Sequence, residues 1–178
     1  MSFKDHYNQE IKKKIMQELK LENVMEVPRI KKIVVNVGAG EAVTDKKVLD
    51  KIQEHLNLIT GQKSVITKAR KSVSAFKIRK GLPIGVKVTL RDIRMYNFLE
   101  KLIKIVIPRL RDFKGINDKS IDDHGNLNLG FSEQTLFPEI EFDKIDKIRG
   151  LEVTIVTNAR DKNRGKKLFA ALGIPFMK

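Results

Sequence analysis

Residues 62–91 constrain the fold of this chain more than any other part of the sequence. They include nine lysines or arginines, and no acidic residue occurs anywhere between Glu54 and Asp92. Both ends of the stretch have the composition of β-strands, and glycines and a proline interrupt its middle. This pattern predicts a long positive loop that is held out from the edge of a sheet.

The composition of the whole chain favours a polyanionic partner. Its 178 residues include 36 basic and 22 acidic side chains, a formal net charge of +14, which favours nucleic acid first and an anionic membrane surface second. A hydrophobic fraction of 41% is enough for a buried core, and the lack of cysteine excludes disulfides and thiol chemistry. No apolar run approaches the roughly 20 residues of a membrane helix. With a polar N-terminus that lacks a signal region, the expected location is cytoplasmic.

Apolar periodicity predicts helices and strands in mixed order. Because no βα unit repeats, we expect an α+β fold, formed as one domain over residues 1–178. Helices would pack on one face of a largely antiparallel sheet, from which a basic loop at about residues 68–85 projects. Thr44 or Asp45 is expected to cap the second helix, and Pro108 to kink or restart the third. The expected helices are 3–19, 45–59, 94–113 and 161–172, and the expected strands are 29–37, 85–91, 127–131 and 151–157.

Two of these strands alternate clearly between apolar and polar residues. Alternate residues of a strand point to opposite faces of its sheet. The expected core residues are Ile33, Val35 and Val37 on the first strand and Val86, Val88 and Leu90 on the second. The opposite face then carries Lys32, Val34 and Asn36 together with Lys87, Thr89 and Arg91. A polar and basic sheet surface of this kind is able to meet RNA.

The basic loop has a plainer interpretation as a solvated charged loop. Against it, ordinary protein surfaces mix both signs of charge, whereas this stretch has one sign only. Its lysines and arginines would neutralise phosphates and release counterions, so that binding weakens as salt rises. Phe76, the only aromatic residue in the loop, either stacks on a base or anchors the loop to the body of the protein.

No motif in the sequence supports catalysis. A Gly-Ala-Gly sequence at residues 38–40 lies between a strand and a helix, but it lacks the third glycine and the lysine of nucleotide-binding loops, so a simple turn is favoured. His55 and His124 have no nucleophile or carboxylate at a diagnostic spacing. We therefore expect no enzyme, no cofactor and no metal site.

The segment 117–144 reverses the charge balance, with seven acids against two lysines. Asp122 and Asp123 are expected to initiate a turn at residues 123–125. Glu139, Glu141 and Asp143 lack the spacing of a calcium loop. We expect an acidic face that is either solvated or meets a basic protein.

Five blocks, in order and over nearly the whole chain, resemble the bacterial-type family of large-subunit ribosomal protein number five, which binds 5S rRNA. Long blocks in a fixed order are far more specific than any short motif. They are VPRIKKIVVNVGAGEA (27–42), ITGQKSVITKARKSVSAFKIRKGLPIGVKVTLR (59–91), IPRLRDFKG (107–115), FPEIEFDKIDKIRGLEVTIVT (137–157) and ALGIPF (171–176).

The resemblance implies a structural protein that attaches 5S rRNA to the central protuberance of the large subunit. In this family the sheet surface that meets 5S rRNA includes the Asn of VVNVG, the Gln of TGQK and the Thr of KVTLR. These are Asn36, Gln62 and Thr89 here, with Lys63, Lys87 and Arg91 beside them. Strand alternation independently places Asn36, Thr89 and Arg91 away from the core.

The family's extended loop, here about residues 68–85, is implied to reach the tRNA in the peptidyl site. Further implied partners are large-subunit rRNA, neighbouring ribosomal proteins and the basic small-subunit ribosomal protein number thirteen, which the family contacts in a bridge between the subunits. We expect no membrane partner. We assign the bridge contact to the acidic segment 117–144, because opposite charge would steer that partner. The expected tRNA-contacting residues are Lys68, Arg70, Lys71, Ser72, Phe76, Lys77, Arg79 and Lys80.

One departure from the family is Gly165, which falls early in the last helix where a better helix former is more usual. It puts the start of that helix in question. Two other functions stay open: a free-standing RNA chaperone or regulator that uses the same loop, and an enzyme that binds phosphate-bearing substrates at residues 38–40. The RNA that co-purifies with the protein separates the first of these from a ribosomal role.

Overall fold

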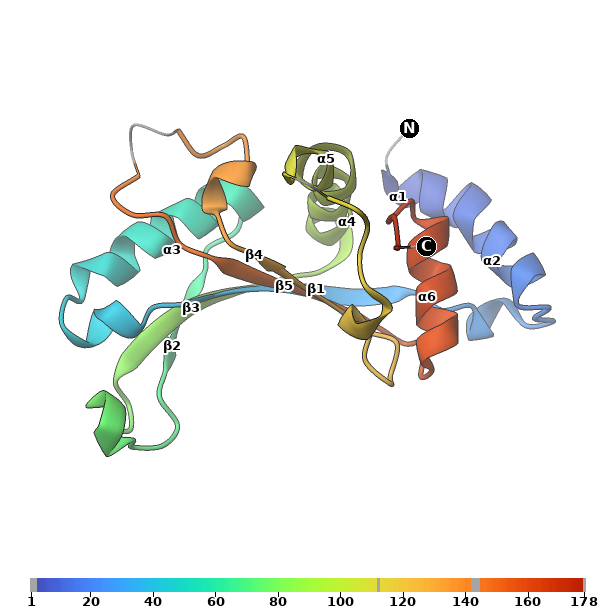
Figure 1. Ribbon diagram of the computed structural model, residues 1–178. Coiled ribbons are helices and arrows are strands. Elements are labelled where there is room, and N and C mark those ends of the chain that lie inside the picture. Colours follow the sequence, from blue (N-terminus) through green and yellow to red (C-terminus); the bar gives the residue numbers. More distant parts are fainter. Residues whose placement is uncertain (1–2, 112, 142–144, 178) are drawn as a thin grey trace. The chain divides into compact units, whose positions relative to one another are not determined.

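The computed structural model describes residues 3–111, 113–141 and 145–177. Its strands form one antiparallel five-stranded sheet in the order β2-β3-β1-β5-β4 (Figure 1). The predicted α+β class is therefore confirmed. The strands are β1 (Ile30–Gly38), β2 (Val65–Lys68), β3 (Pro83–Leu90), β4 (Leu127–Phe131) and β5 (Leu151–Thr157).

The helices lie close to their predicted positions. A continuous helical run near the N-terminus contains a π-helical turn, Tyr7–Ile11, between α1 and α2. A second π turn, Leu102–Val106, separates α4 from α5. The bounds are α1 (Phe3–His6), α2 (Lys12–Glu18), α3 (Lys47–Thr60), α4 (Asp92–Lys101), α5 (Ile107–Arg109) and α6 (Lys162–Ala171).

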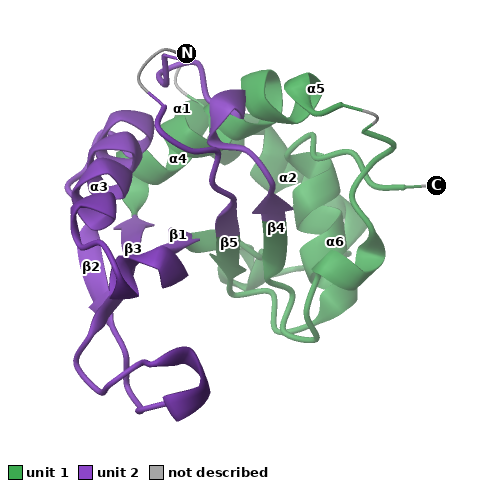
Figure 2. Cartoon of the chain, turned by 60° about the vertical axis from the view of Figure 1, so that its left-hand side comes forward, with its two compact units in different colours: residues 1–33, 91–129, 154–178 green, residues 34–90, 130–153 purple. Residues whose placement is uncertain are grey.

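The chain forms two compact units, each made from separate stretches of sequence (Figure 2). Unit 1 comprises residues 1–33, 91–129 and 154–178, and unit 2 comprises residues 34–90 and 130–153. The assignment of all 178 residues to one domain stays a prediction. Each unit is described below by itself.

Unit 1 has a core of helix side chains packed on the ends of strands. The predicted apolar stripe of the first helix is buried at Phe3, Tyr7, Ile11 and Ile15. The third predicted helix begins two residues earlier than expected, at Asp92, and ends at Arg109 instead of continuing to residue 113. Pro108 lies in the first turn of α5, where its missing N–H needs no partner, and the helix ends because Leu110 adopts an extended conformation.

The last helix of unit 1 forms in spite of Gly165. The carboxylate of Asp161 accepts hydrogen bonds from the backbone N–H groups of Asn163 and Arg164, and this cap starts the helix at Lys162. A Cβ atom at Gly165 would lie 2.6 Å from the Cα of Gly125. Glycine is therefore required by the close approach of two backbone segments, which outweighs its poor helix propensity.

Unit 2 has a core between α3 and one face of its strands. Val35, Val37, Val86, Val88 and Leu90 are all at most 5% exposed, as the alternation predicts. They share this core with the inward side of α3, which buries Val48, Leu49, Ile52, Leu56 and Ile59. Asp45 accepts a hydrogen bond from the N–H of Lys47 at 2.9 Å, so the helix begins two residues later than predicted. Gly61 ends it in the left-handed conformation, with φ of 63°.

The strands agree with their predictions apart from their ends. The predicted strand 85–91 is β3, which begins earlier, at Pro83, and ends at Leu90. Arg91 consequently lies outside the strand, as the residue that precedes α4, and it belongs to unit 1. The predicted strands 127–131 and 151–157 are confirmed residue for residue. The turn at residues 123–125 is also confirmed, because Asp122 accepts hydrogen bonds from the N–H groups of His124 and Asn126.

Candidate nucleic-acid interface

The face of unit 2 opposite α3 is open and carries the predicted polar residues. Asn36 on β1 is half-buried, and on β3 Lys87 is exposed and Thr89 half-buried. The strands β1 and β3 are neighbours in the sheet, and their buried valines point the other way. The structure therefore brings Asn36, Lys87 and Thr89 to one surface, which we call the open face.

Gln62 and Lys63 lie where the chain leaves α3 and enters β2. The Gln62 side-chain N–H donates to the carbonyl oxygen of Thr89 at 3.0 Å, which fixes Gln62 beside the end of β3. The next residue, Ser64, is only 2% exposed, and its N–H donates to the Asn57 side chain at 2.6 Å. These bonds tie the base of the basic hairpin to α3. We call Gln62, Lys63 and Ser64 the hairpin root.

Arg91, the sixth predicted 5S rRNA-binding residue, follows the last residue of β3. It adopts an extended conformation immediately before α4, within unit 1, and its side chain is exposed. The alternation argument placed it on the outer side of a strand that in fact ends one residue earlier.

Sequence reasoning missed an apolar residue on the open face. Val65 pairs directly with Lys87 in the antiparallel β2–β3 ladder, so the two side chains share a face. Val65 is 61% exposed, which is unusual for a valine in a strand. Only the register of the ladder places Val65 opposite Lys87, and this register cannot be read from the sequence.

A shallow hollow of about 520 Å³ adjoins Asn36 within unit 2. Glu152, exposed on β5, gives it an acceptor, and Ser132 gives it a hydroxyl. A Cβ atom at Gly38 or Gly130 would have no atom within 4 Å, so close packing does not require glycine at either position. The hollow therefore leaves backbone and the Asn36 amide accessible to a ligand on the open face. Its lining is Asn36, Gly38, Gly130, Phe131, Ser132, Gly150, Leu151 and Glu152.

The predicted basic loop is an ordered extension of the β2–β3 hairpin. Backbone hydrogen bonds cross it between Val73 and Ile78 in both directions, at 2.9 and 3.1 Å, and the N–H of Lys80 donates to the Ser72 hydroxyl at 2.9 Å. A 3-10 turn, Ser74–Phe76, forms its end. Lys77 follows in the left-handed region, with φ of 54°, an uncommon conformation for a non-glycine residue. We call residues 69–82 the hairpin tip.

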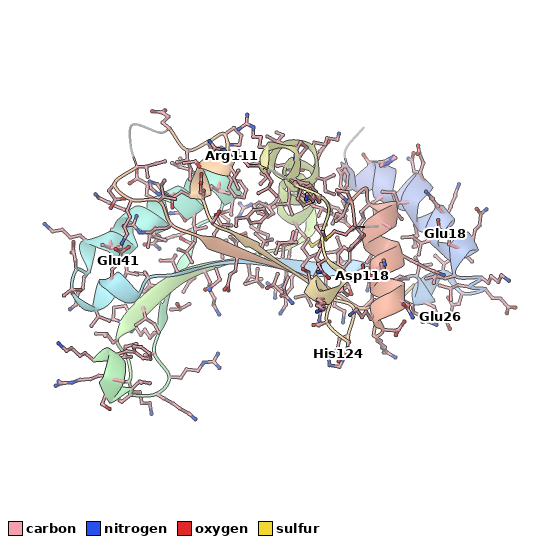
Figure 3. All side chains as sticks on the ribbon, in the orientation of Figure 1. Glu18, Glu26, Glu41, Arg111, Asp118 and His124 are labelled. Atoms are coloured by element: carbon pink, nitrogen blue, oxygen red, sulfur yellow. The ribbon has the colours of Figure 1, made fainter. Side chains whose placement is uncertain are left out.

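Most side chains of the hairpin tip are exposed to solvent. In Figure 3 they radiate from the green loop and many end in blue nitrogen atoms. Phe76 is 72% exposed, so the alternative that it anchors the loop to the body of the protein is wrong. All the predicted tRNA-contacting residues are exposed, namely Lys68, Arg70, Lys71, Ser72, Phe76, Lys77, Arg79 and Lys80. Among the residues that the structure describes, none of these six cations forms an ion pair.

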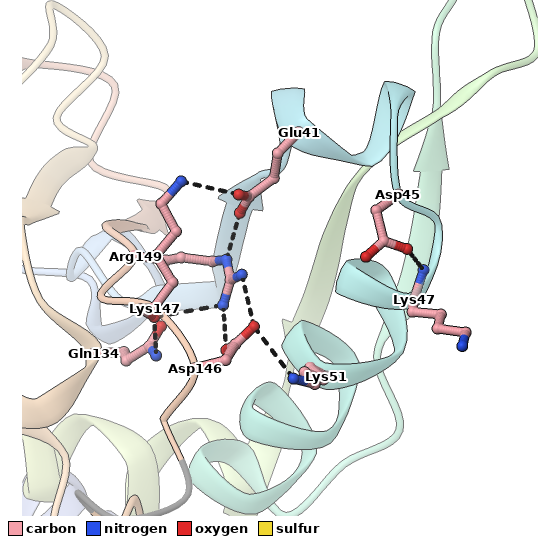
Figure 4. A network of polar contacts seen from close by, with 8 residues as sticks. All are labelled: Glu41, Asp45, Lys47, Lys51, Gln134, Asp146, Lys147 and Arg149. Carbon is pink, nitrogen blue, oxygen red and sulfur yellow. Dashed lines mark hydrogen bonds and ion pairs between the residues drawn. The ribbon is translucent and has the colours of Figure 1, made fainter.

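Unit 2 also contains basic residues with the opposite surroundings (Figure 4). The side chain of Arg149 is 6% exposed; its Nε donates to Glu41 at 2.7 Å and its Nη1 to Asp146 at 2.8 Å. Lys147 and Lys51 complete the network, at 2.9 Å from Glu41 and 3.4 Å from Asp146. Hydrogen bonds from Arg149 hold the pKa of Asp146 well below its ordinary value, and those from Arg149 and Lys147 lower the pKa of Glu41. We call these five residues the Arg149 cluster.

Two family comparisons bear on the chain. Residues 23–79 match the family described as Ribosomal protein L5, and residues 83–176 match the model that describes the C-terminus of the same ribosomal family. The second match alone extends over more than half of the sequence. The chain belongs to the ribosomal protein L5 family. It is therefore a structural constituent of the ribosome, a protein that binds rRNA and takes part in translation.

L5 family members are structural and not enzymatic. Gly38 ends β1 and Gly40 begins a four-residue 3-10 turn, so the turn interpretation of this sequence is confirmed. His55 is half-buried, and burial lowers its pKa. No group of three potential metal ligands occurs within residues 3–111, 113–141 and 145–177, and no helix in those ranges is long and apolar enough to span a membrane.

The acidic segment 117–144 uses part of its charge inside the fold. In unit 1, Asp118 accepts a hydrogen bond from Lys166 at 2.5 Å, and Asp122 is held in the turn described above. In unit 2, Glu133 accepts a hydrogen bond from Thr135 at 3.0 Å. Asp143 and Lys144 lie outside the described residues. The assignment of this segment to a protein contact stays a prediction.

Proposed function

We propose that the open face of unit 2 and the hairpin root bind 5S rRNA, and that the protein attaches this RNA to the central protuberance of the large subunit. The observation that carries the proposal is that Asn36, Lys87 and Thr89 share one uncovered surface. The hydrogen bond from Gln62 to Thr89 adds Gln62 to the same end of that surface. Polar side chains presented by a rigid sheet are suited to contact ribose and base edges, while Lys63 and Lys87 meet phosphates.

Binding of purified 5S rRNA over a range of salt concentrations tests this proposal. We expect tight binding that weakens steeply as salt rises. Asn36→Leu and Thr89→Leu should each reduce the affinity at least tenfold, because each removes polar contacts and adds bulk at the interface. Asn97→Leu, at an exposed position of α4, is the matched control and should bind normally. Equal affinity of the parent protein for duplex DNA of the same length would reject the proposal.

We further propose that the hairpin tip contacts the tRNA in the peptidyl site. The support for this is its projection beyond the sheet, its exposed unpaired cations and the exposed ring of Phe76, which is free to stack on a base. Replacing Lys68, Arg70, Lys71, Arg79 and Lys80 together by glutamine should weaken retention of tRNA on reconstituted ribosomes and spare 5S rRNA binding. Loss of 5S rRNA binding instead would show that the roles of tip and open face are reversed.

We retain the contact with small-subunit ribosomal protein number thirteen as a separate proposal, supported by the charge of the segment 117–144 alone. A free-standing RNA chaperone would use the same hairpin tip. It would bind unrelated RNAs as well as 5S rRNA, so recovery of a mixed RNA population with the purified protein would favour it over the ribosomal role.

A further inference from the structure

Unit 1 contains a groove of about 850 Å³, and Arg91 is its only lining residue among those assigned above to 5S rRNA. The first helical run, the segment before β1, the start of β1 and the beginning of α4 provide its walls. Six of its lining side chains are basic and a single one, Asp92, is acidic. The basic residues are Lys4, Lys12, Arg29, Lys31, Lys32 and Arg91.

The positive charge of this groove is almost uncompensated. Lys4 donates a hydrogen bond to Asp92 at 2.6 Å, so the one acid is already paired. Within the part of the chain that the structure describes, the other five cations form no ion pair. Arg29, Lys31 and Arg91 are exposed. Like charges that converge on a concave surface raise its potential and concentrate anions there.

The floor of the groove is neutral and fixed. Tyr7 and Tyr96 are 4% and 8% exposed, and their ring centroids lie 5.7 Å apart. The Tyr7 hydroxyl donates to the carbonyl oxygen of Pro28 at 3.1 Å, and burial raises the pKa of both phenols, which keeps them uncharged. Because buried side chains hold this floor in place, the groove exists before a ligand arrives.

The rim of the groove is apolar. Val24 and Met25, in the 3-10 turn Val24–Glu26, are 46% and 74% exposed. The Asn23 side chain caps this turn by accepting the N–H of Met25 at 2.8 Å, so the turn is held in position. Cationic walls with an exposed apolar rim suit a ligand that has charges at intervals and flat apolar groups between them.

We propose that this groove binds the sugar-phosphate backbone of RNA, with Met25 against a ribose or base. Its volume far exceeds that of one phosphate, and its unpaired cations come from α2, the start of β1 and the residue before α4. A concave site of this length fits a strand better than a flat membrane surface. The proposal assigns Arg91 to the groove, whose lining includes this residue. The site stands whether or not unit 2 binds 5S rRNA.

The test compares two triple variants that remove equal charge from unit 1. Lys12→Gln, Arg29→Gln and Lys31→Gln alter the groove, whereas Lys13→Gln, Lys14→Gln and Arg164→Gln alter exposed positions outside its lining. Binding is measured with 5S rRNA, and with a labelled 12-nucleotide RNA added either to the free protein or to the preformed complex with 5S rRNA. Thermal unfolding confirms that both variants fold.

We expect the groove variant to bind RNA at least tenfold more weakly than the control in one of these arms. For the groove variant, the slope of the logarithm of the binding constant against the logarithm of the salt concentration should be shallower by about 2. Each phosphate contact contributes about 0.7–0.9 to this slope. A defect with 5S rRNA identifies a second part of that RNA as the ligand, and a defect only with the labelled RNA identifies a separate strand. Equal binding by both variants in every arm overturns the proposal. Failure of the parent protein to bind 5S rRNA would reject the proposed function. The proposal for the groove would then be tested by the binding of the labelled RNA to the two variants.

Discussion

The hairpin tip and the Arg149 cluster, both in unit 2, hold basic side chains in opposite surroundings. Arg149 is buried between two carboxylates, while Arg79 and its neighbours in the tip are exposed and pair with no described residue. A buried guanidinium without partners is very costly, so the first arrangement is required by the fold. An exposed cation without partners contributes little to stability, so stability does not account for the second arrangement. The same residue type is therefore part of the folded structure in one place, while in the other it is available for the tRNA contact proposed above.

Substitution of Arg149 should have the largest effect on stability. Arg149→Met leaves Glu41 and Asp146 facing each other without the guanidinium that joins them. Loss of one partner from a buried pair costs about 3–5 kcal/mol, and since both carboxylates are roughly a third exposed we expect about 2–3 kcal/mol. The free energy of unfolding in urea measures it. Arg79→Met, the matched change in the hairpin tip, should stay within about 0.5 kcal/mol.

Removing a hydrogen bond at the hairpin root should have the second-largest effect on stability. Asn57→Ala removes the acceptor of the Ser64 N–H, and Ser64 is buried, whereas the Ser64 hydroxyl keeps the Gln53 carbonyl oxygen as an acceptor. An unsatisfied buried donor costs about 1–3 kcal/mol, so unfolding in urea should require correspondingly less denaturant. Asn97→Ala, at an exposed site of α4, is the control. Comparable stabilities of the two variants would mean that the root does not depend on α3.

Acid should weaken the Arg149 cluster and leave the hairpin tip unaffected. The pKa values of Asp146 and Glu41 are lowered in the folded protein, so their contribution is full above the ordinary values of 3.8 and 4.5 and is lost as pH falls below them. We expect the urea midpoint to fall between about pH 5 and about pH 2.5. The fall should be clearly smaller in Arg149→Met and unchanged in Arg79→Met. An identical pH dependence in all three proteins would place the acid sensitivity elsewhere.

The smallest effect on stability should come from Phe76→Ala. Because the ring is 72% exposed and supports no core, the free energy of unfolding should change by less than about 0.5 kcal/mol. Retention of tRNA on reconstituted ribosomes should fall nonetheless, since base stacking is worth about 1–3 kcal/mol per base. Lys77→Ala, the neighbouring exposed residue, separates loss of the ring from loss of charge. A destabilised Phe76→Ala variant with normal tRNA retention would give Phe76 a structural role.

The sequence allowed the open face and the core of unit 2 to be predicted because both depend on local alternation. Val86, Val88 and Leu90 point inward and Lys87 and Thr89 outward, as period-2 patterning requires. The predicted end of the second strand, at Arg91, was one residue too late because α4 begins at Asp92, and the boundaries of elements depend on tertiary contacts.

Features that join distant residues escaped prediction for the same reason. Glu41 and Arg149 are 108 residues apart, and no local pattern relates them. The groove of unit 1 gathers Lys12, Lys31 and Arg91 from separate elements. Gly165 is informative only once its contact with the Gly125 backbone is seen. In each case the signal is spatial and not periodic.

The hairpin tip is closed upon itself. Its hydrogen bonds run from Ala69 to Leu82, from Gly81 to Ala69, from Val73 to Ile78 and from Lys80 to Ser72, so each partner belongs to the same stretch, residues 69–82. The conformation of such a segment therefore depends on its own residues. Grafted onto another antiparallel hairpin whose ladder ends with the same spacing, the tip should keep its conformation.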